Sequence, residues 1–173
     1  MEITFQGRAR KFGDDINTDY IIASSRKKET LDTSVLRRYL MEGVDPAFAA
    51  SVQPGDLIVA GRNFGCGSAM EIAVTVLQAA GIRAVLAQSF SRTFSRNAVN
   101  NGLFPIEYDT STISEGDKLT VELHGGQLTV ANGSTCVRAS VRSSIPGLML
   151  EILEKGGLVP YIRAHGGFGA QKT

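Results

Sequence analysis

The residues that could do chemistry are most concentrated in a glycine-rich segment, residues 61–71, which reads GRNFGCGSAME. It follows a continuous apolar run, 57–60, and leads into apolar residues at helical spacing, so it should join a buried strand to a helix. In an open α/β sheet, ligands bind where the strands end. Glycines let the backbone approach a ligand, and the free N–H groups at a helix start favour anions. The segment therefore predicts a ligand site.

Ser68, near the end of this segment, has two interpretations. Its hydroxyl can point into a cleft where backbone amides stabilise developing negative charge. Alternatively, Ser68 and Glu71 form a capping box, in which Ser68 is the N-cap and only starts the helix. The segment lacks the Gly-Lys-Ser/Thr of a phosphate loop and the Gly-x-Gly-x-x-Gly of a dinucleotide site. Both interpretations of Ser68 stay open at this point.

The elements that must position this segment follow from the spacing of apolar residues and from turn signals. Strand, helix and strand over 57–87 form a βαβ unit, whose two strands should be parallel. A polar loop is expected over 24–30, and a glycine-rich tail over 165–173 should be loose. The chain thus has the α/β fold class, with a single domain over 1–164. The other expected strands cover 2–12, 20–22 and 104–108, a hairpin covers 118–130, and helices cover 33–41, 69–80, 90–101 and 146–155.

The composition excludes several classes of protein. The 173 residues carry 18 basic and 17 acidic side chains, and this net charge of +1 is not the basic excess of a nucleic-acid-binding protein. The first residues lack the apolar run of a signal peptide, and no stretch is long and apolar enough to span a membrane. We therefore expect a cytoplasmic protein that binds neither nucleic acid nor a membrane.

The two cysteines and two histidines offer little basis for a metal or redox site. Cys66 and Cys136 are too few for a disulfide framework or for the ligands of an iron–sulfur cluster. Cys66 should have a packing role, and Cys136 should be a buried strand residue. His124 should lie exposed at the hairpin tip and His165 in the loose tail, and neither is assigned a role. The chain itself is therefore expected to bind no metal and no cofactor.

Residues 63–68, Asn-Phe-Gly-Cys-Gly-Ser, resemble the signature of the small subunits of 3-isopropylmalate dehydratase, in the aconitase superfamily. Further stretches match that family in the same order over nearly the whole chain, and such a series is far more specific than one glycine loop. The matching stretches are 13–19, 80–85, 89–90, 96–97, 101–103 and 156–159.

The resemblance implies a swivelling β/β/α domain with a mixed sheet or barrel flanked by helices. It implies a hydro-lyase small subunit of leucine biosynthesis that is active only with a large subunit. The large subunit carries a [4Fe–4S] cluster, which acts as a Lewis acid on the departing hydroxyl of a hydroxy di- or tricarboxylate. Ser68 occupies the position of the serine that removes the proton from the adjacent carbon, and Asp19 matches an active-site aspartate. We also expect that the isolated small subunit can form a homo-oligomer.

The sequence departs from the family directly after Ser68. The usual signature continues Ser-Ser-Arg-Glu-His, whereas residues 68–72 here read Ser-Ala-Met-Glu-Ile. In the family the arginine helps to bind a substrate carboxylate, but Met70 has neither a charge nor a donor. Losing a charge-assisted contact weakens binding by about 1.5–3 kcal/mol unless another cation replaces it.

Cations that could replace that arginine stand in two places. The loop over 24–30, which in the family closes over the substrate and helps to sort substrates, carries Arg26, Lys27 and Lys28. Arg62 lies within the glycine-rich segment. The alternative for the cationic loop is an ordinary solvated surface. Our predicted substrate contacts are Arg26, Lys27, Arg62, Gly67 and Ala69.

Three functions are compatible with these residues. The first is a 3-isopropylmalate dehydratase small subunit, and the second is a related dehydratase of dimethylmalate, methylmalate or homoaconitate. The third is a non-catalytic swivel module that only docks on a partner or binds a carboxylate, and the altered residues 69–72 motivate it.

Overall fold

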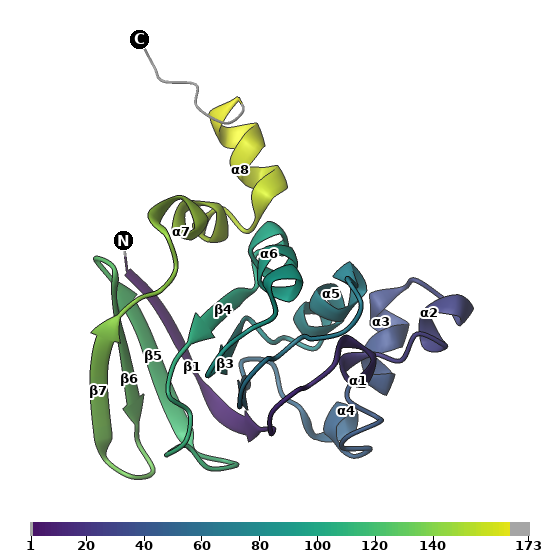
Figure 1. The fold of residues 1–173 in the computed structure, drawn as a ribbon, viewed down its shortest axis with the longest axis horizontal. Coiled ribbons are helices and arrows are strands. Elements are labelled where there is room, and N and C mark those ends of the chain that lie inside the picture. The colour runs from purple at the N-terminus through teal and green to yellow at the C-terminus, as the bar shows by residue number, and fades with distance from the viewer. Residues whose placement is uncertain (1, 167–173) are drawn as a thin grey trace.

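The computed structural model describes residues 2–166, and its strands are β1 (Glu2–Lys11), β2 (Leu57–Ala60), β3 (Ala84–Ala87), β4 (Phe104–Glu107), β5 (Lys118–His124), β6 (Gln127–Asn132) and β7 (Val137–Arg142). They form one curled sheet in the order β4-β3-β2-β1-β5-β6-β7 (Figure 1). Neighbours from β1 to β4 are parallel, whereas β5, β6 and β7 extend the sheet from the other edge of β1 in antiparallel pairs. The expected mixed sheet is therefore confirmed.

Most of the expected helices are also confirmed, with starts one or two residues later. The expected helix over 33–41 is divided into a short α-helix and a 3-10 turn. Residues 2–166 also form four helices that were not expected. The helices are α1 (Thr18–Ile21), α2 (Arg26–Glu29), α3 (Thr33–Leu36), η1 (Arg37–Tyr39, the 3-10 turn), α4 (Phe48–Ser51), α5 (Glu71–Ala79), α6 (Arg92–Asn101), α7 (Gly147–Glu154) and α8 (Leu158–His165).

The segment after β1 corrects two expectations. The sequence predicts a strand over 20–22, but Tyr20 and Ile21 lie in α1. The reason is local, because the side-chain oxygen of Asn17 accepts a hydrogen bond from the N–H of Asp19 at 2.9 Å and caps a helical turn. The predicted loop over 24–30 contains α2, a single turn without a buried residue.

The C-terminal part of the chain corrects two more expectations from the sequence. Cys136 is exposed rather than buried, because it lies at a φ of 58° in the turn that precedes β7. His165 is the last residue of α8, not part of a loose tail, and its Nδ1 lies 2.9 Å from the carbonyl oxygen of Tyr161. Residues 167–173 of the predicted tail lie outside the described residues. His124 is exposed beside the hairpin turn, as expected.

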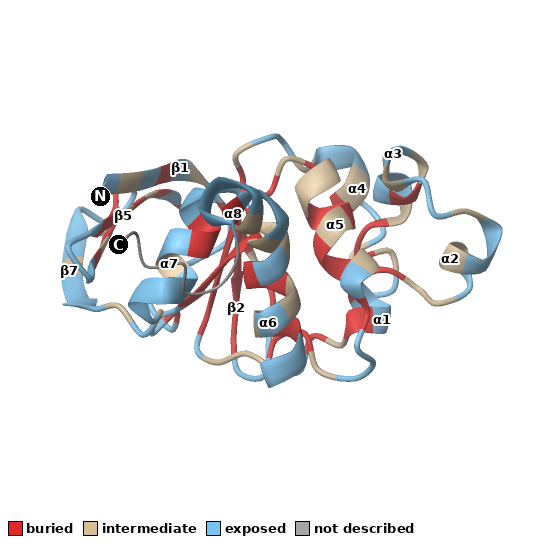
Figure 2. Ribbon diagram, turned by 90° about the horizontal axis from the view of Figure 1, so that it is seen from above, coloured by how far each residue is buried: buried red, intermediate tan, exposed pale blue. Residues whose placement is uncertain are grey.

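Two apolar clusters lie on opposite faces of the parallel strands (Figure 2). In β2, Ile58 and Ala60 belong to one cluster and Leu57 and Val59 to the other, because successive side chains of a strand point to opposite faces. The first cluster is covered mainly by α5 and by the chain between β1 and β2. The second is enclosed by the antiparallel strands, α7 and α8. β2 is thus buried on both faces, which its continuous apolar sequence predicts.

The carboxyl ends of β1, β2 and β3 lie at one edge of the sheet, since these strands are parallel neighbours. The loops that follow them therefore leave the sheet side by side. The N–H of Gly61 donates to the carbonyl oxygen of Gly13, and the N–H of Gln88 donates to the carbonyl oxygen of Gly61, both at 3.0 Å. This topology places the glycine-rich segment in the middle of the edge, between the other two loops.

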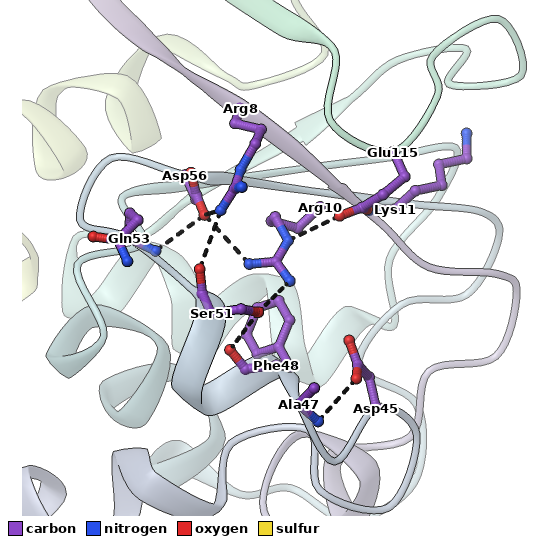
Figure 3. A network of polar contacts seen from close by, with 10 residues as sticks. All are labelled: Arg8, Arg10, Lys11, Asp45, Ala47, Phe48, Ser51, Gln53, Asp56 and Glu115. Carbon is purple, nitrogen blue, oxygen red and sulfur yellow. Dashed lines mark hydrogen bonds and ion pairs between the residues drawn. The ribbon is translucent and has the colours of Figure 1, made fainter.

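A buried polar network joins β1 to the turn before β2 (Figure 3). Arg10 is 6% exposed, and its guanidinium lies over the ring of Phe48, 4.6 Å from the ring centre. The same guanidinium contacts Asp56 at 3.4 Å and Glu115 at 3.0 Å. Asp56 also accepts a hydrogen bond from Arg8 at 3.0 Å. These two carboxylates offset the cost of burying the positive charge of Arg10.

We expect Asp56→Asn to lower the free energy of unfolding by about 2 kcal/mol, because the buried Arg10 loses its nearest buried counter-charge. Urea denaturation, monitored by circular dichroism, would measure this difference in the free energy of unfolding. The control is Glu122→Gln, which breaks the exposed contact with Arg138 and should cost less than about 0.5 kcal/mol. Equal stabilities for the two variants would contradict the role of Asp56 as the buried counter-charge of Arg10.

Candidate functional site

The glycine-rich segment is tied to the loop that follows β1 by backbone hydrogen bonds. The N–H of Gly65 donates to the carbonyl oxygen of Ile16, and the N–H of Thr18 donates to that of Cys66, both at 2.8 Å. Gly67 has a φ of +88°, and a Cβ on it would clash with the side chain of Asn17. Glycine is thus required where the two loops touch.

On its other side the segment is tied to the loop after β3. The N–H of Phe64 donates to the carbonyl oxygen of Ser89 at 3.0 Å. The hydroxyl of Ser91 donates to the carbonyl oxygen of Gly65 at 2.7 Å, and Ser91 is also the N-cap of α6. The segment is therefore fixed from both sides before it reaches Ser68.

Ser68 does not cap a helix, so the capping-box interpretation is wrong. The helix α5 starts at Glu71, and its N-cap is Met70, which is extended and makes no side-chain capping bond. Two residues thus separate Ser68 from the helix. Ser68 is exposed, and its carbonyl oxygen accepts a hydrogen bond from the hydroxyl of Thr18 at 2.9 Å. Its own hydroxyl has no hydrogen-bond partner within residues 2–166.

The backbone around Ser68 presents unused donors. Gly67, Ser68 and Ala69 are all exposed. Within the part of the chain that the structure describes, none of their three N–H groups donates a hydrogen bond to the protein. A cluster of free N–H groups beside a free hydroxyl can bind a carboxylate or stabilise an oxyanion. The site is open to solvent on this side.

Asp19 lies in α1, next to Thr18, whose hydroxyl holds the backbone of Ser68. A carboxylate oxygen of Asp19 accepts hydrogen bonds from the N–H of Ser24, at 3.1 Å, and from the hydroxyl of the same serine. Asp19 is otherwise exposed. Its contacts place it as an anchor for the start of the loop that carries the cationic residues.

Among the predicted cations, Lys27 is the one that contacts Met70. Its ammonium lies 3.1 Å from the sulfur of Met70, which is only 5% exposed. The hydroxyl of Ser24 lies 3.7 Å from the same sulfur. A thioether is a weak acceptor, and Lys27 has no ion pair with a carboxylate within residues 2–166. Lys27 is thus a half-buried cation without a counter-charge among the residues that the structure describes.

The other predicted cations are placed differently. Arg26 already has a counter-charge, because it binds both oxygens of Glu42, at 2.9 and 3.1 Å. Arg62 is exposed at the edge of the site, and its side chain makes no ion pair or hydrogen bond among the described residues. Lys28 is exposed on the outer side of α2. Lys27 and Arg62 therefore have charges free for an anion, and Arg26 does not.

A pair of residues in the left-handed region was missed by the sequence reasoning. Asp15 has a φ of 55° and Asn63 a φ of 58°. The side-chain amide of Asn63 donates to the carboxylate of Asp15 at 2.7 Å. Asp and Asn tolerate this conformation better than other side chains. Their places in two matching stretches of the family resemblance were the signal that could have indicated a joint role.

Cys66 is partly buried within the segment. Burial, and then the negative charge of Asp15, raise the pKa of the Cys66 thiol. A raised pKa means less thiolate at a given pH, so Cys66 should react more slowly with iodoacetamide than the exposed Cys136 at about pH 8. Peptide mass spectrometry at timed intervals would measure both rates. Faster labelling of Cys66 would contradict this prediction.

Two further observations concern the described residues as a whole. Among residues 2–166, no three His, Cys, Asp or Glu side chains lie close enough together to share a metal ion. Within the same range, no helix has the length and the apolar composition that crossing a membrane requires.

Comparisons with known proteins identify the family of the chain. Residues 10–111 match the family model described as "Aconitase C-terminal domain". The 3-isopropylmalate dehydratase small subunit 2 of Archaeoglobus fulgidus is 46% identical over 160 residues, which is 92% of this chain and 95% of that protein. The methanogen homoaconitase small subunit of Methanocaldococcus jannaschii is 43% identical over 158 residues, 91% of each chain.

A solved structure has the same fold. The crystal structure titled 3-isopropylmalate dehydratase from Methanocaldococcus jannaschii superimposes with a TM-score of 0.87 at 41% identity, and the match covers 95% of this chain and 96% of that one. The expected swivel-domain fold is confirmed by this match. The chain therefore belongs to the aconitase C-terminal domain family, among the small subunits of its dehydratases and isomerases.

Proposed function

We propose that this chain works with a large subunit to dehydrate and rehydrate a hydroxy di- or tricarboxylate, and that Ser68 is the base. The observation that carries the proposal is the exposed Ser68 hydroxyl, which has no partner within residues 2–166 and is flanked by free N–H groups. A hydroxyl that bonds to nothing in the described part of its own chain is available to a substrate. The open face suits a half-site that a second subunit closes.

Ser68 would remove the proton from the carbon next to the one that bears the departing hydroxyl. Serine is a poor base in water, so the alkoxide form needs positive charge and amide donors in a site that excludes water. The N–H groups of Gly67 and Ala69 supply donors, and Lys27 supplies a charge. Asp19 would act indirectly, by holding Ser24 at the start of the cationic loop.

The large subunit of the proposed enzyme supplies a [4Fe–4S] cluster, which acts as a Lewis acid on the departing hydroxyl. No described group of residues in this chain is placed to hold such a cluster. The contribution of this chain is the base and part of the anion site. Lys27 and Arg62 would bind one substrate carboxylate together with the free N–H groups.

The favoured substrate is 3-isopropylmalate, because relatives that match nearly the full chain are named 3-isopropylmalate dehydratase small subunits. Others are named homoaconitase and isopropylmalate/citramalate isomerase small subunits, so homoaconitate and methylated malates are the alternatives. Met70 in place of the family arginine favours a second candidate function, a docking module that no longer dehydrates. The contact between Lys27 and Met70 argues against that candidate, since it returns a cation to the same place.

The test is to co-express this chain with the large subunit encoded in the same genome and to reconstitute the cluster anaerobically. The purified complex would be assayed with 3-isopropylmalate, dimethylmalate, methylmalate and homoaconitate for the absorbance of the alkene product. Turnover of one acid would support the proposal and name the substrate. A stable complex with an intact cluster spectrum that turns over none of them would contradict it, provided that an arginine-containing relative is active in the same assay.

A further inference from the structure

The helix α2 is held to the molecule almost entirely by polar side chains. It projects from the end of the domain in Figure 1, and none of its residues is buried. Burial of apolar surface is the main force that fixes a segment, so α2 needs another restraint. Such a restraint matters because α2 carries Lys27, the cation that faces the candidate site.

Arg26 provides such a restraint, and its partners are different from the Met70 that Lys27 contacts. Its Nε and Nη2 atoms donate to the two oxygens of Glu42, at 2.9 and 3.1 Å. Its guanidinium also lies over the ring of Tyr39, 3.9 Å from the ring centre. A bidentate pair combined with a stacked ring fixes the position and the plane of the arginine.

The platform under Arg26 belongs to the core. Tyr39 packs against the first apolar cluster, and its neighbours Leu40 and Met41 are fully buried. The N–H of Met41 donates to the carbonyl oxygen of Ile21 at 3.0 Å, which ties this turn back to α1. A contact to Tyr39 and Glu42 therefore attaches α2 to a rigid part of the fold.

We infer that Arg26, Glu42 and Tyr39 form a latch that positions α2, and with it Lys27, beside Ser68. Arg26 is then a positioning residue and not a substrate contact, which revises its predicted role. The inference rests on the proposed function as far as Lys27 meets a substrate. The attachment of α2 itself does not depend on that function.

Trypsin tests the attachment directly, because α2 contains the cleavable residues 26–28 and Glu42→Gln leaves all of them in place. We expect this variant to be cleaved within α2 about two- to fivefold faster than the wild type, since cleavage follows the open population. The matched control is Glu122→Gln, which breaks another pair at 2.9 Å with a glutamate of similar exposure, 36% against 33%. Equal cleavage of both variants and wild type would overturn the latch.

Kinetics of the two-subunit complex test the positioning of Lys27. The double variant Glu42→Gln/Tyr39→Leu should raise KM about threefold or more, because only the latched fraction binds substrate well, and kcat should stay within about twofold. Tyr39→Phe keeps the ring, so its KM and kcat should match those of the wild type. Faster cleavage without a change in KM, or a fall in kcat at constant KM, would overturn the positioning role. If the wild-type complex is inactive on every acid, the proposed function fails and the cleavage test still decides the latch.

Discussion

Replacing Ser68 by alanine is expected to lower kcat of the reconstituted complex by about 10²–10⁴-fold, with KM changed by less than about threefold. The reason is that the variant loses the base but keeps the free N–H groups of Gly67 and Ala69, which would bind the substrate. Steady-state kinetics on the acid that the wild type turns over would measure both constants. Removing an interaction that is made only in the transition state should lower kcat and leave substrate binding almost unchanged.

Stability distinguishes this role from a structural one. If Ser68 were a helix cap, its removal would cost about 1 kcal/mol of stability. The hydroxyl has no partner within residues 2–166, so the melting temperature of the isolated chain should not change. Ser140→Ala, which removes a hydroxyl paired with Thr129 at 2.9 Å on the outer strands, is the control for activity. Full turnover by the Ser68→Ala complex would refute the assignment of the base.

The sheet edge that carries the site could be predicted because its signals are local. The apolar runs of β2 and β3, the helical spacing between them and the closing glycines define a βαβ unit without further information. That unit fixes where residues 61–70 must lie. The alternating pattern of residues 137–142 could have predicted β7 in the same way.

The partners within the site could not be predicted in this way, because they are distant in the sequence. Lys27 meets Met70 and Thr18 meets Ser68 only after the chain segments that follow β1 and β2 have been brought together. Arg26 and Lys27 are neighbours in the sequence and both carry a positive charge. Their residue types alone therefore do not show that they have different partners. Consecutive residues of a helix point about 100° apart. Arg26 therefore meets a carboxylate, whereas Lys27 meets a thioether.

Replacing Lys27 by alanine is expected to raise KM by about 10- to 100-fold, since the complex would lose a charge-assisted contact to a substrate carboxylate. A smaller fall in kcat should accompany it, because the same charge helps to stabilise the Ser68 alkoxide. Lys28→Ala is the matched control, as Lys28 is exposed on the same helix, and it should leave both constants within about twofold. Equal effects of the two variants would show that only the overall charge of the loop matters.

The contact between Lys27 and Met70 also predicts a rescue. If Lys27 substitutes for the arginine that the family resemblance implies at position 70, then Met70→Arg should restore binding to the Lys27→Ala variant. We expect the double variant to recover at least about tenfold in KM, because an arginine there can bind a carboxylate with two donors. Met70→Arg alone should weaken binding or stability, since it sets two cations about one contact distance apart. Failure of the double variant to recover, while its melting temperature matches that of Lys27→Ala, would show that the two positions do not share one substrate carboxylate.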